Sequence, residues 1–159
     1  MEQFLAGQAI IITGGGQGIG RRLAQHLASL GAAVCIADID PGAAQATLDL
    51  LQSANYTGMA VACDVTSVED TEKMAAEVLS RFGSIDVLIN NAGIFPIKMF
   101  SDISAGEWQR VIEINLTGTF LAAKAVYSQM KKQGQGKIIN IASVAGRVGG
   151  AGFAHYSAT

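Results

Sequence analysis

The sequence predicts an α/β fold built on a doubly wound parallel sheet. Short, almost entirely apolar runs, typical of strands buried on both faces, alternate with longer segments whose apolar residues recur with helical period. These helical segments are long enough to serve as the crossovers that join parallel strands. The 159 residues allow one domain and hardly more, so we expect a single domain over residues 1–159.

Five runs are expected to form the strands of this sheet. They are Ala9–Thr13, Ala33–Ala37, Gly58–Cys63, Ile85–Asn90 and Lys137–Ile141. No closing element follows the last run, so its strand would be a bare edge, which intact proteins usually cover. We therefore expect the sheet to be incomplete at its C-terminal edge.

The segments between the strands carry apolar stripes that would each cover one face of the sheet. The stripes are Ile19, Leu23, Leu27 and Leu30; Ala44, Leu48 and Leu51; and Val68, Ala75, Val78, Leu79 and Phe82. Capping-box spacing predicts helix starts at Thr66–Glu69 and Ser104–Glu107. Left-handed residues just past helix ends are expected at Gly31, Gly83 and Gly134. The long helical segment 104–133 should break near residues 115–118.

Composition excludes several classes of protein. The net charge is −2 without a basic cluster, which argues against a nucleic-acid partner. No apolar run approaches the roughly 18 residues of a membrane span, and the N-terminus does not resemble a signal peptide. Cys35 and Cys63 lie in apolar runs without metal-ligand spacing, so we expect buried thiols, no metal site and a reducing compartment, the cytoplasm.

The first strand runs directly into a glycine-rich turn, Thr13-Gly14-Gly15-Gly16-Gln17-Gly18-Ile19-Gly20, and a helix follows. Glycines let the backbone approach a pyrophosphate, and the helix N-terminus offers free N–H groups to it. The spacing differs from a strict G-x-G-x-x-G, but the strand before and the helix after favour a dinucleotide site of Rossmann type. We expect Thr13, Gly14 and the segment Gln17, Gly18, Ile19 and Gly20 to bind the cofactor.

Asp38 ends the second strand. A carboxylate there can accept hydrogen bonds from the adenosine ribose and would repel a 2′-phosphate, which favours NAD over NADP. No arginine or lysine stands beside Asp38 in the sequence. The alternative interpretation is an acid in a solvated loop, or a cap of the next helix.

Six motifs in register resemble those of the short-chain dehydrogenase/reductase family, in its single-domain, NAD-preferring form. They are Thr13-Gly14-x-x-x-Gly18-Ile19-Gly20, Asp64-Val65, Asn90-Asn91-Ala92-Gly93, Asn115, Ser143 and Tyr156. They cover essentially the whole chain. The resemblance implies that Asp64 and Val65 contact the adenine, and that Asn91, Ala92 and Gly93 lie beside the cofactor.

The resemblance also implies an oxidoreductase that transfers a hydride between NAD and a secondary alcohol or carbonyl compound. Tyr156 would exchange a proton with the substrate oxygen, Ser143 would donate a hydrogen bond to it, and Asn115 would hold a water in a proton relay. In the family a lysine follows the tyrosine after three residues, but this sequence ends at Thr159. We therefore expect residues 1–159 to be the N-terminal portion of such an enzyme and to be inactive alone.

Several alternatives stay open. One is a catalytically inactive nucleotide-binding or interaction protein. The resemblance leaves three substrate classes open: aryl alcohols or pyridoxal, ketones on an acyl carrier, and sugars or butanediol. The direction of the reaction is open as well. The family's counterpart of segment 108–131 packs against its copy in a neighbouring subunit, so the resemblance implies a homodimer or homotetramer.

Overall fold

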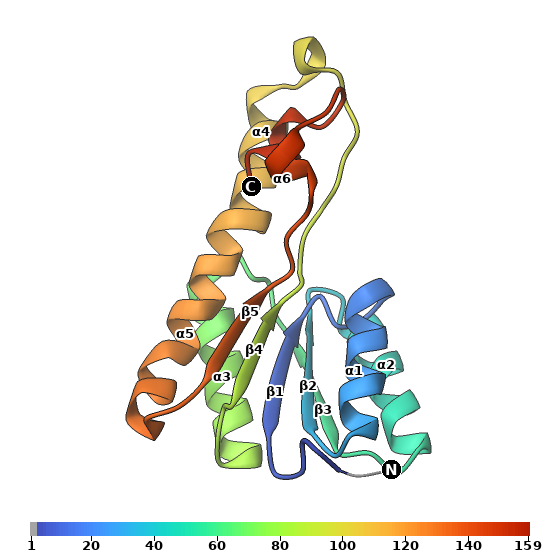
Figure 1. Cartoon of the computed structure of the whole chain (residues 1–159), viewed down its shortest axis with the longest axis vertical. Coiled ribbons are helices and arrows are strands. Elements are labelled where there is room, and N and C mark those ends of the chain that lie inside the picture. The colour runs from blue at the N-terminus through green and yellow to red at the C-terminus, as the bar shows by residue number, and fades with distance from the viewer. Residues whose placement is uncertain (1–2) are drawn as a thin grey trace.

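A five-stranded parallel sheet runs through the protein, with helices on both of its faces (Figure 1). The computed structural model describes residues 3–159. The strands are β1 (Ala9–Thr13), β2 (Ala33–Asp38), β3 (Gly58–Ala62), β4 (Val87–Asn90) and β5 (Lys137–Asn140). Their order is β3-β2-β1-β4-β5, and all four neighbouring pairs are parallel. The predicted doubly wound sheet is confirmed, and the strand order reverses at β1, where such sheets bind ligands.

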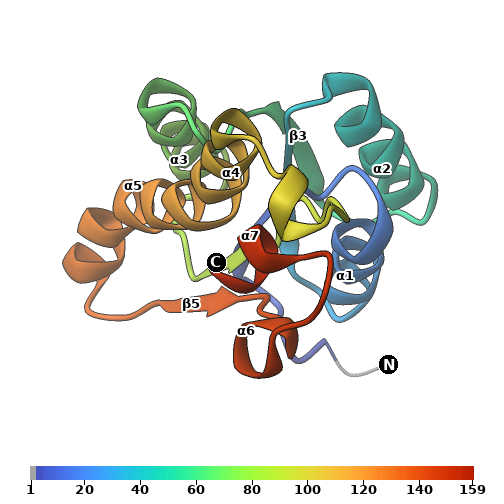
Figure 2. The same cartoon turned by 90° about the horizontal axis from the view of Figure 1, so that it is seen from above.

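Alternate residues of β1 enter two separate cores. Ile10 and Ile12 pack with α1 (Gly18–Ser29) and α2 (Pro41–Ser53) on one face. On the other face, Ile11 packs with α3 (Val68–Phe82) and α5 (Gly118–Gln133). Because successive side chains of a strand point to opposite faces, one run of isoleucines joins both helical layers. Figure 2 shows the two layers on either side of the sheet.

The remaining helical elements lie beyond the carboxyl ends of the strands, at the top of Figure 1. They are η1 (Phe100–Asp102), α4 (Ala105–Ile112), η2 (Glu113–Thr117), α6 (Ala145–Val148) and α7 (Ala154–Ser157). The segment η2 is π-helical and joins α4 to α5, so the predicted break near residues 115–118 is confirmed. Within residues 3–159, no helix is long and apolar enough to cross a bilayer.

The prediction that the strands are buried on both faces is confirmed for the inner strands and is wrong for the edge strands. All residues of β1 and β4 are buried, whereas all four residues of β5 are exposed. Ile138 and Ile139 are 40% and 44% exposed because no strand or helix among the described residues covers the outer side of β5. Apolar composition alone does not distinguish a central strand from an edge strand.

Most predicted helix boundaries are confirmed. Ser104 and Glu107 form both halves of a capping box. Gly31, Gly83 and Gly134 all have positive φ, as expected for residues just past a helix. The helix start predicted from the capping-box spacing of Thr66 and Glu69 is wrong. The hydroxyl and N–H of Thr66 both donate to Asp64, and the N-cap of α3 is the next residue, Ser67.

Two side chains of the predicted apolar stripes are not in the core. Ser67 is the N-cap of α3, and this places Val68 in the first turn, where it is 52% exposed. Ile19 is 64% exposed, and the buried face of α1 consists of Gly20, Ala24 and Ala28 instead. The N-terminal turn of α1 lies at the carboxyl edge of the sheet, so the exposed Ile19 side chain lines a pocket there.

Candidate functional site

The glycine-rich turn 14–20 joins β1 to α1 at the carboxyl edge of the sheet. Gly14 and Gly18 have φ of +62° and +53°, a region that glycine adopts without steric cost. A Cβ on Gly14 would lie 2.9 Å from the Ala92 Cα, so the turn packs directly on the segment after β4. A Cβ on Gly20 would collide with the Gly14 carbonyl oxygen. Gly18 meets nothing within 4 Å of its Cβ position and leaves space above the turn.

The N-terminus of α1 opens into this space without a cap. Gln17 occupies the N-cap position, but its side chain makes no hydrogen bond to the helix. The first turn also contains no acidic residue. Free N–H groups and the positive end of the helix dipole at such a terminus bind phosphate groups. The turn therefore presents an uncapped helix N-terminus that can accept an anionic group.

Asp38 stands at the carboxyl end of β2, beside the same turn. One of its carboxylate oxygens accepts a hydrogen bond from the Gly16 N–H at 2.8 Å, and the other accepts one from the Asp40 N–H at 3.0 Å. Asp38 is only 7% exposed, yet it lines the pocket described below. Because a carboxylate has about four acceptor sites, two remain for hydrogen-bond donors in the pocket.

A reciprocal set of hydrogen bonds joins the ends of β1 and β4. The Asn91 side-chain amide donates to the carbonyl oxygens of Thr13 and Gly14, at 3.0 Å each. In return, the Thr13 hydroxyl accepts from the N–H groups of Asn91 and Ala92, at 3.1 Å each. Thr13 and Asn91 thereby fix the glycine turn to the segment after β4, at the point where the strand order reverses.

Asp64 and Val65 follow β3 on the other side of the cleft. The Asp64 carboxylate accepts from the Thr66 N–H at 2.9 Å and from the Thr66 hydroxyl at 2.8 Å. Val65 packs on α5, where a Cβ on Gly118 would come 2.6 Å from the Val65 Cγ2. The absence of a side chain at Gly118 thus allows this segment to approach the helix closely.

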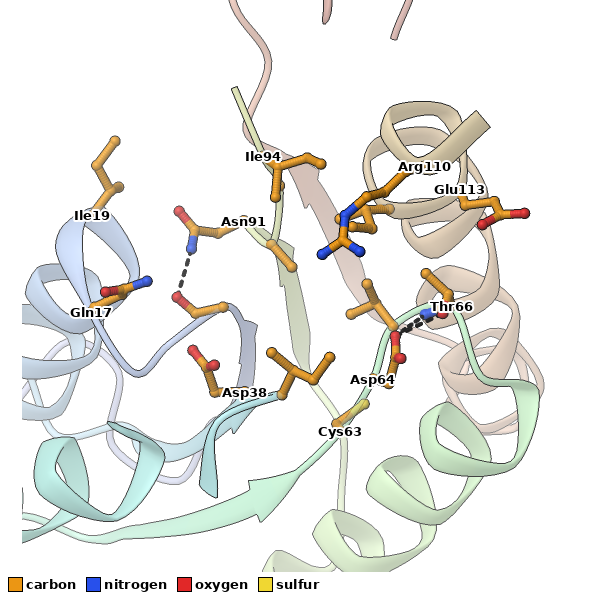
Figure 3. Close-up of a pocket in the computed structure, with 16 residues that line it drawn as sticks. Gln17, Ile19, Asp38, Cys63, Asp64, Thr66, Asn91, Ile94, Arg110 and Glu113 are labelled. Carbon is orange, nitrogen blue, oxygen red and sulfur yellow. Dashed lines mark hydrogen bonds between the residues drawn. The ribbon is translucent and has the colours of Figure 1, made fainter. Parts of the chain in front are cut away.

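A pocket of about 520 Å³ lies between these segments (Figure 3). Of the twelve residues predicted to bind the cofactor, nine line it: Gly14, Gln17, Ile19, Asp38, Asp64, Val65, Asn91, Ala92 and Gly93. Thr13, Gly18 and Gly20 do not line it. Thr13 and Gly20 shape the turn from behind, through the contacts described above.

Seven lining residues were not predicted: Ile39, Cys63, Thr66, Ile94, Arg110, Glu113 and Ile114. Figure 3 shows Arg110 reaching from α4 into the pocket, across from Gln17 and Ile19. The helical spacing of Arg110 and Ile114 is a sequence signal that could have placed both on one face. Ile39 follows Asp38 directly and is 69% exposed. An apolar residue just past a strand is the sequence signal that could have identified it as a pocket residue.

The two cysteines are free and buried, as predicted. Burial raises the pKa of the Cys35 thiol far above its ordinary value. Burial also raises the pKa of the Cys63 thiol to about 12, with smaller contributions from the charges of Asp70 and Asp64. Both side chains therefore remain thiols at neutral pH and offer no nucleophile to the pocket.

A second pocket, of about 450 Å³, continues the first. The two share Ile19, Asn91, Ala92, Gly93 and Ile94 in their linings. The three predicted catalytic residues, Asn115, Ser143 and Tyr156, all line the second pocket. The fold thus brings them to one site, although they come from η2, the segment after β5, and α7. No lysine or arginine of the described residues lines this pocket.

Asn115 lies in the π-helical turn η2 and holds the segment after β4. Its side-chain amide donates to the Ile94 carbonyl at 3.0 Å, and its side-chain oxygen accepts from the Ile94 N–H at 2.9 Å. π-Helical turns are frequent at functional sites. Asn115 is thus engaged with the backbone of Ile94, a contact that its sequence motif did not indicate.

Comparison with known proteins agrees with this geometry. The family model described as "short chain dehydrogenase" matches residues 8–159. The chain is 39% identical over 154 residues to 3-oxoacyl-[acyl-carrier-protein] reductase FabG of Vibrio cholerae, covering 97% of this chain and 62% of the relative. It is 42% identical over 156 residues to sorbitol dehydrogenase of Cereibacter sphaeroides, covering 98% and 60%.

Among solved structures, an NAD⁺-bound xylitol dehydrogenase superposes with a TM-score of 0.94 at 34% identity, covering 98% of this chain and 60% of that one. The chain thus spans about three fifths of the length of these relatives. The residues matched by the family model include the glycine turn, Asp38 and the three predicted catalytic residues, Asn115, Ser143 and Tyr156. This chain belongs to the short-chain dehydrogenase family.

Proposed function

We propose that the protein is the N-terminal part of an oxidoreductase that transfers a hydride between NAD and a secondary alcohol or carbonyl compound. The observation that carries this proposal is the continuity of the two pockets. One cleft leads from Asp38 and the uncapped N-terminus of α1 to Ser143 and Tyr156. Members of this family use a nicotinamide coenzyme, and such a cleft suits an elongated dinucleotide with its reactive end beside the tyrosine.

The residues of the first pocket would hold the coenzyme by its adenosine half. The N-terminus of α1 would receive the diphosphate, Asp38 the ribose, and Asp64 with Val65 the adenine. Asp38 supports NAD rather than NADP, because its carboxylate would repel a 2′-phosphate. The NAD⁺-bound xylitol dehydrogenase among the similar structures also favours NAD.

The residues of the second pocket would manage the substrate oxygen and its proton. When bound, the nicotinamide supplies the hydride acceptor or donor. Tyr156 would exchange a proton with the alcohol or carbonyl oxygen, and the Ser143 hydroxyl would donate a hydrogen bond that stabilises charge on that oxygen. Asn115 would support a water in the proton path while it holds Ile94.

For residues 1–159 by themselves we propose coenzyme binding without turnover. The reason is that no cationic side chain of the described residues lines the pocket around Tyr156 to favour its phenolate. Steady NAD reduction by this polypeptide alone, with any alcohol, would contradict the proposal.

We further propose a homodimer or homotetramer in a reducing compartment, the cytoplasm. Leu116, Phe120 and Tyr127 lie on one face of the η2–α5 segment and are 49%, 60% and 60% exposed, an apolar stripe suited to a second copy. The free thiols Cys35 and Cys63 agree with a reducing compartment. Light scattering that gives the mass of a single subunit would refute the oligomer.

The activity is tested in the polypeptide as its gene encodes it. Tyr156→Phe and Ser143→Ala should each lower kcat by about 10²–10⁴-fold. The Kd for NAD, measured by calorimetry, should stay within a factor of about three, since neither side chain lines the first pocket. Tyr56→Phe is the matched control, because Tyr56 packs on the core away from the cleft. Absence of NAD binding by the unmodified protein would refute the proposed function.

A further inference from the structure

Phe95 packs between Tyr156 and Phe153, and the two phenylalanines form an aromatic wall that the proposed reaction does not use. The Phe95 ring lies 4.5 Å from the Tyr156 ring, centroid to centroid, at an interplanar angle of 59°. It lies 5.5 Å from the Phe153 ring, also at 59°. Phe95 lines the second pocket together with Ser143 and Tyr156, and it is 51% exposed. Much of its ring is therefore open to a ligand at the site of the chemistry.

The segments that carry the two phenylalanines are fixed to each other. The Lys98 N–H donates to the Gly152 carbonyl at 2.7 Å and so joins segment 94–98 to segment 149–153. Gly152 is buried with φ of +87°, and a Cβ there would come 3.2 Å from Ile97, so glycine permits this approach. The wall is thus preorganised by backbone contacts and does not depend on the two rings alone.

A second tie holds the wall to the body of the protein. The Lys98 ammonium contacts the Glu107 carboxylate at 2.6 Å and 2.8 Å, and Glu107 belongs to the capping box of α4. On the other side, the Phe153 ring lies directly over Gly150, where a Cβ would collide with it. Both rings therefore have a defined place relative to Tyr156.

The other side chains that the described residues contribute to this pocket carry no charge. Among the described residues, its polar groups are the neutral amides and hydroxyls of Asn90, Asn115, Thr119, Asn140, Ser143, Tyr156 and Thr159, beside the backbone of the Asn91–Gly93 segment. Ile94, Ile141 and Ala142 add apolar surface. A charged group next to the reacting carbon would lose hydration without gaining a counter-charge. Within residues 3–159, the lining therefore supplies no counter-charge to a charged substrate.

We propose that Phe95, with Phe153 packed behind it, is a specificity-determining residue, and that the substrate is a secondary alcohol or ketone with an aromatic ring on the reacting carbon. This inference rests on the proposed function. The substrate ring would pack on the open part of Phe95 in an offset or edge-to-face arrangement, which aromatic pairs prefer. In the oxidation, the carbinol C–H hydride passes to NAD and the hydroxyl proton passes to Tyr156, leaving the aryl ketone.

The experiment compares 1-phenylethanol with 2-butanol as substrates of the polypeptide that the gene encodes. Because both are uncharged secondary alcohols, the ratio of their kcat/KM values measures the contribution of the aromatic ring to substrate recognition. We expect the unmodified protein to prefer the phenyl compound at least tenfold. Phe95→Leu should reduce this preference by about two- to tenfold, the contribution of one aromatic pair. Phe153→Leu removes the ring that packs on Phe95 and should reduce the preference by a smaller factor. Phe4→Leu, a change of the same kind at a residue 73% exposed near the N-terminus, should leave it unchanged.

A binding measurement provides a readout apart from turnover. In the presence of NAD, calorimetry should give a lower Kd for acetophenone than for 2-butanone, and Phe95→Leu should narrow the difference. A preference below twofold, an unchanged preference in Phe95→Leu, or an equal change in Phe4→Leu would overturn the inference. If NAD binds and neither ketone does, the inference also fails. If NAD itself does not bind, the proposed function fails first, so the two failures are distinguishable.

Discussion

The proposed role of Asp38 in coenzyme choice can be tested by Asp38→Asn, which removes the charge and keeps the size. At roughly 4 Å and an effective dielectric constant of 20, two unit charges repel by about 4 kcal/mol, an energy that salt reduces. If only a third of it acts on the 2′-phosphate of NADP, the affinity ratio of NADP to NAD rises about tenfold in the variant. NAD itself should bind more weakly, because its ribose loses a charged acceptor whose hydrogen bonds contribute about 1.5–3 kcal/mol.

The structure adds an effect on stability to this prediction. The Asp38 carboxylate accepts from the N–H groups of both Gly16 and Asp40, and an asparagine side chain can keep only one of these hydrogen bonds. The variant should therefore lose about 1–3 kcal/mol of unfolding free energy, which chemical denaturation measures. This loss must be known before the coenzyme affinities are compared.

The assay is calorimetric titration of the gene-encoded polypeptide with NAD and with NADP. Asp40→Asn is the matched control, because Asp40 is exposed, lies outside the pocket, and keeps an acceptor for the N–H groups of Gly42 and Ala43 as asparagine. A change below twofold in the NADP-to-NAD ratio for Asp38→Asn, or an equal change for Asp40→Asn, would refute the reasoning.

Three further predictions concern stability. Gly20→Ala sets a methyl group against the Gly14 carbonyl and should cost about 1–3 kcal/mol in thermal unfolding, whereas Gly106→Ala, with nothing within 4 Å, should be neutral or stabilising. Thr13→Val leaves the N–H groups of Asn91 and Ala92 without their acceptor and should lower the free energy of unfolding by about 2 kcal/mol or more in chemical denaturation. Thr13→Ser keeps the hydroxyl and should keep most of the stability, so equal losses in the two variants would contradict this prediction. Hydrogen bonds from Lys98 and Ser104 lower the pKa of the Glu107 carboxyl from 4.5 to about 2, so its stabilisation is complete above pH 4.5 and is lost as the pH falls toward 2. Glu107→Gln should therefore flatten the decline of Tm over that range, and parallel curves for the two proteins would show that the prediction is wrong.

The fold was largely predictable because its signals are local. Apolar runs and helical stripes predicted every strand to within two residues at each end, and glycines past the helix ends predicted their left-handed residues. The places of the glycine turn and Asp38 were also predictable, since the turn directly follows β1, Asp38 ends β2, and parallel strands bring their carboxyl ends to one edge. The errors at Thr66 and Ile19 arose where side chains turn to the cleft or to a neighbouring loop instead of the core.

The sequence by itself determined the parallel sheet, the glycine-rich turn after β1 and the motif residues, because these depend on short-range patterns along the chain. Only the tertiary structure decided that Arg110 reaches the same pocket as Gln17, that Asn115 holds Ile94, and that Phe95 packs between Phe153 and Tyr156. These contacts join segments that are distant in sequence. Their geometry follows from how helices and loops cross beyond the sheet edge, which no local periodicity encodes.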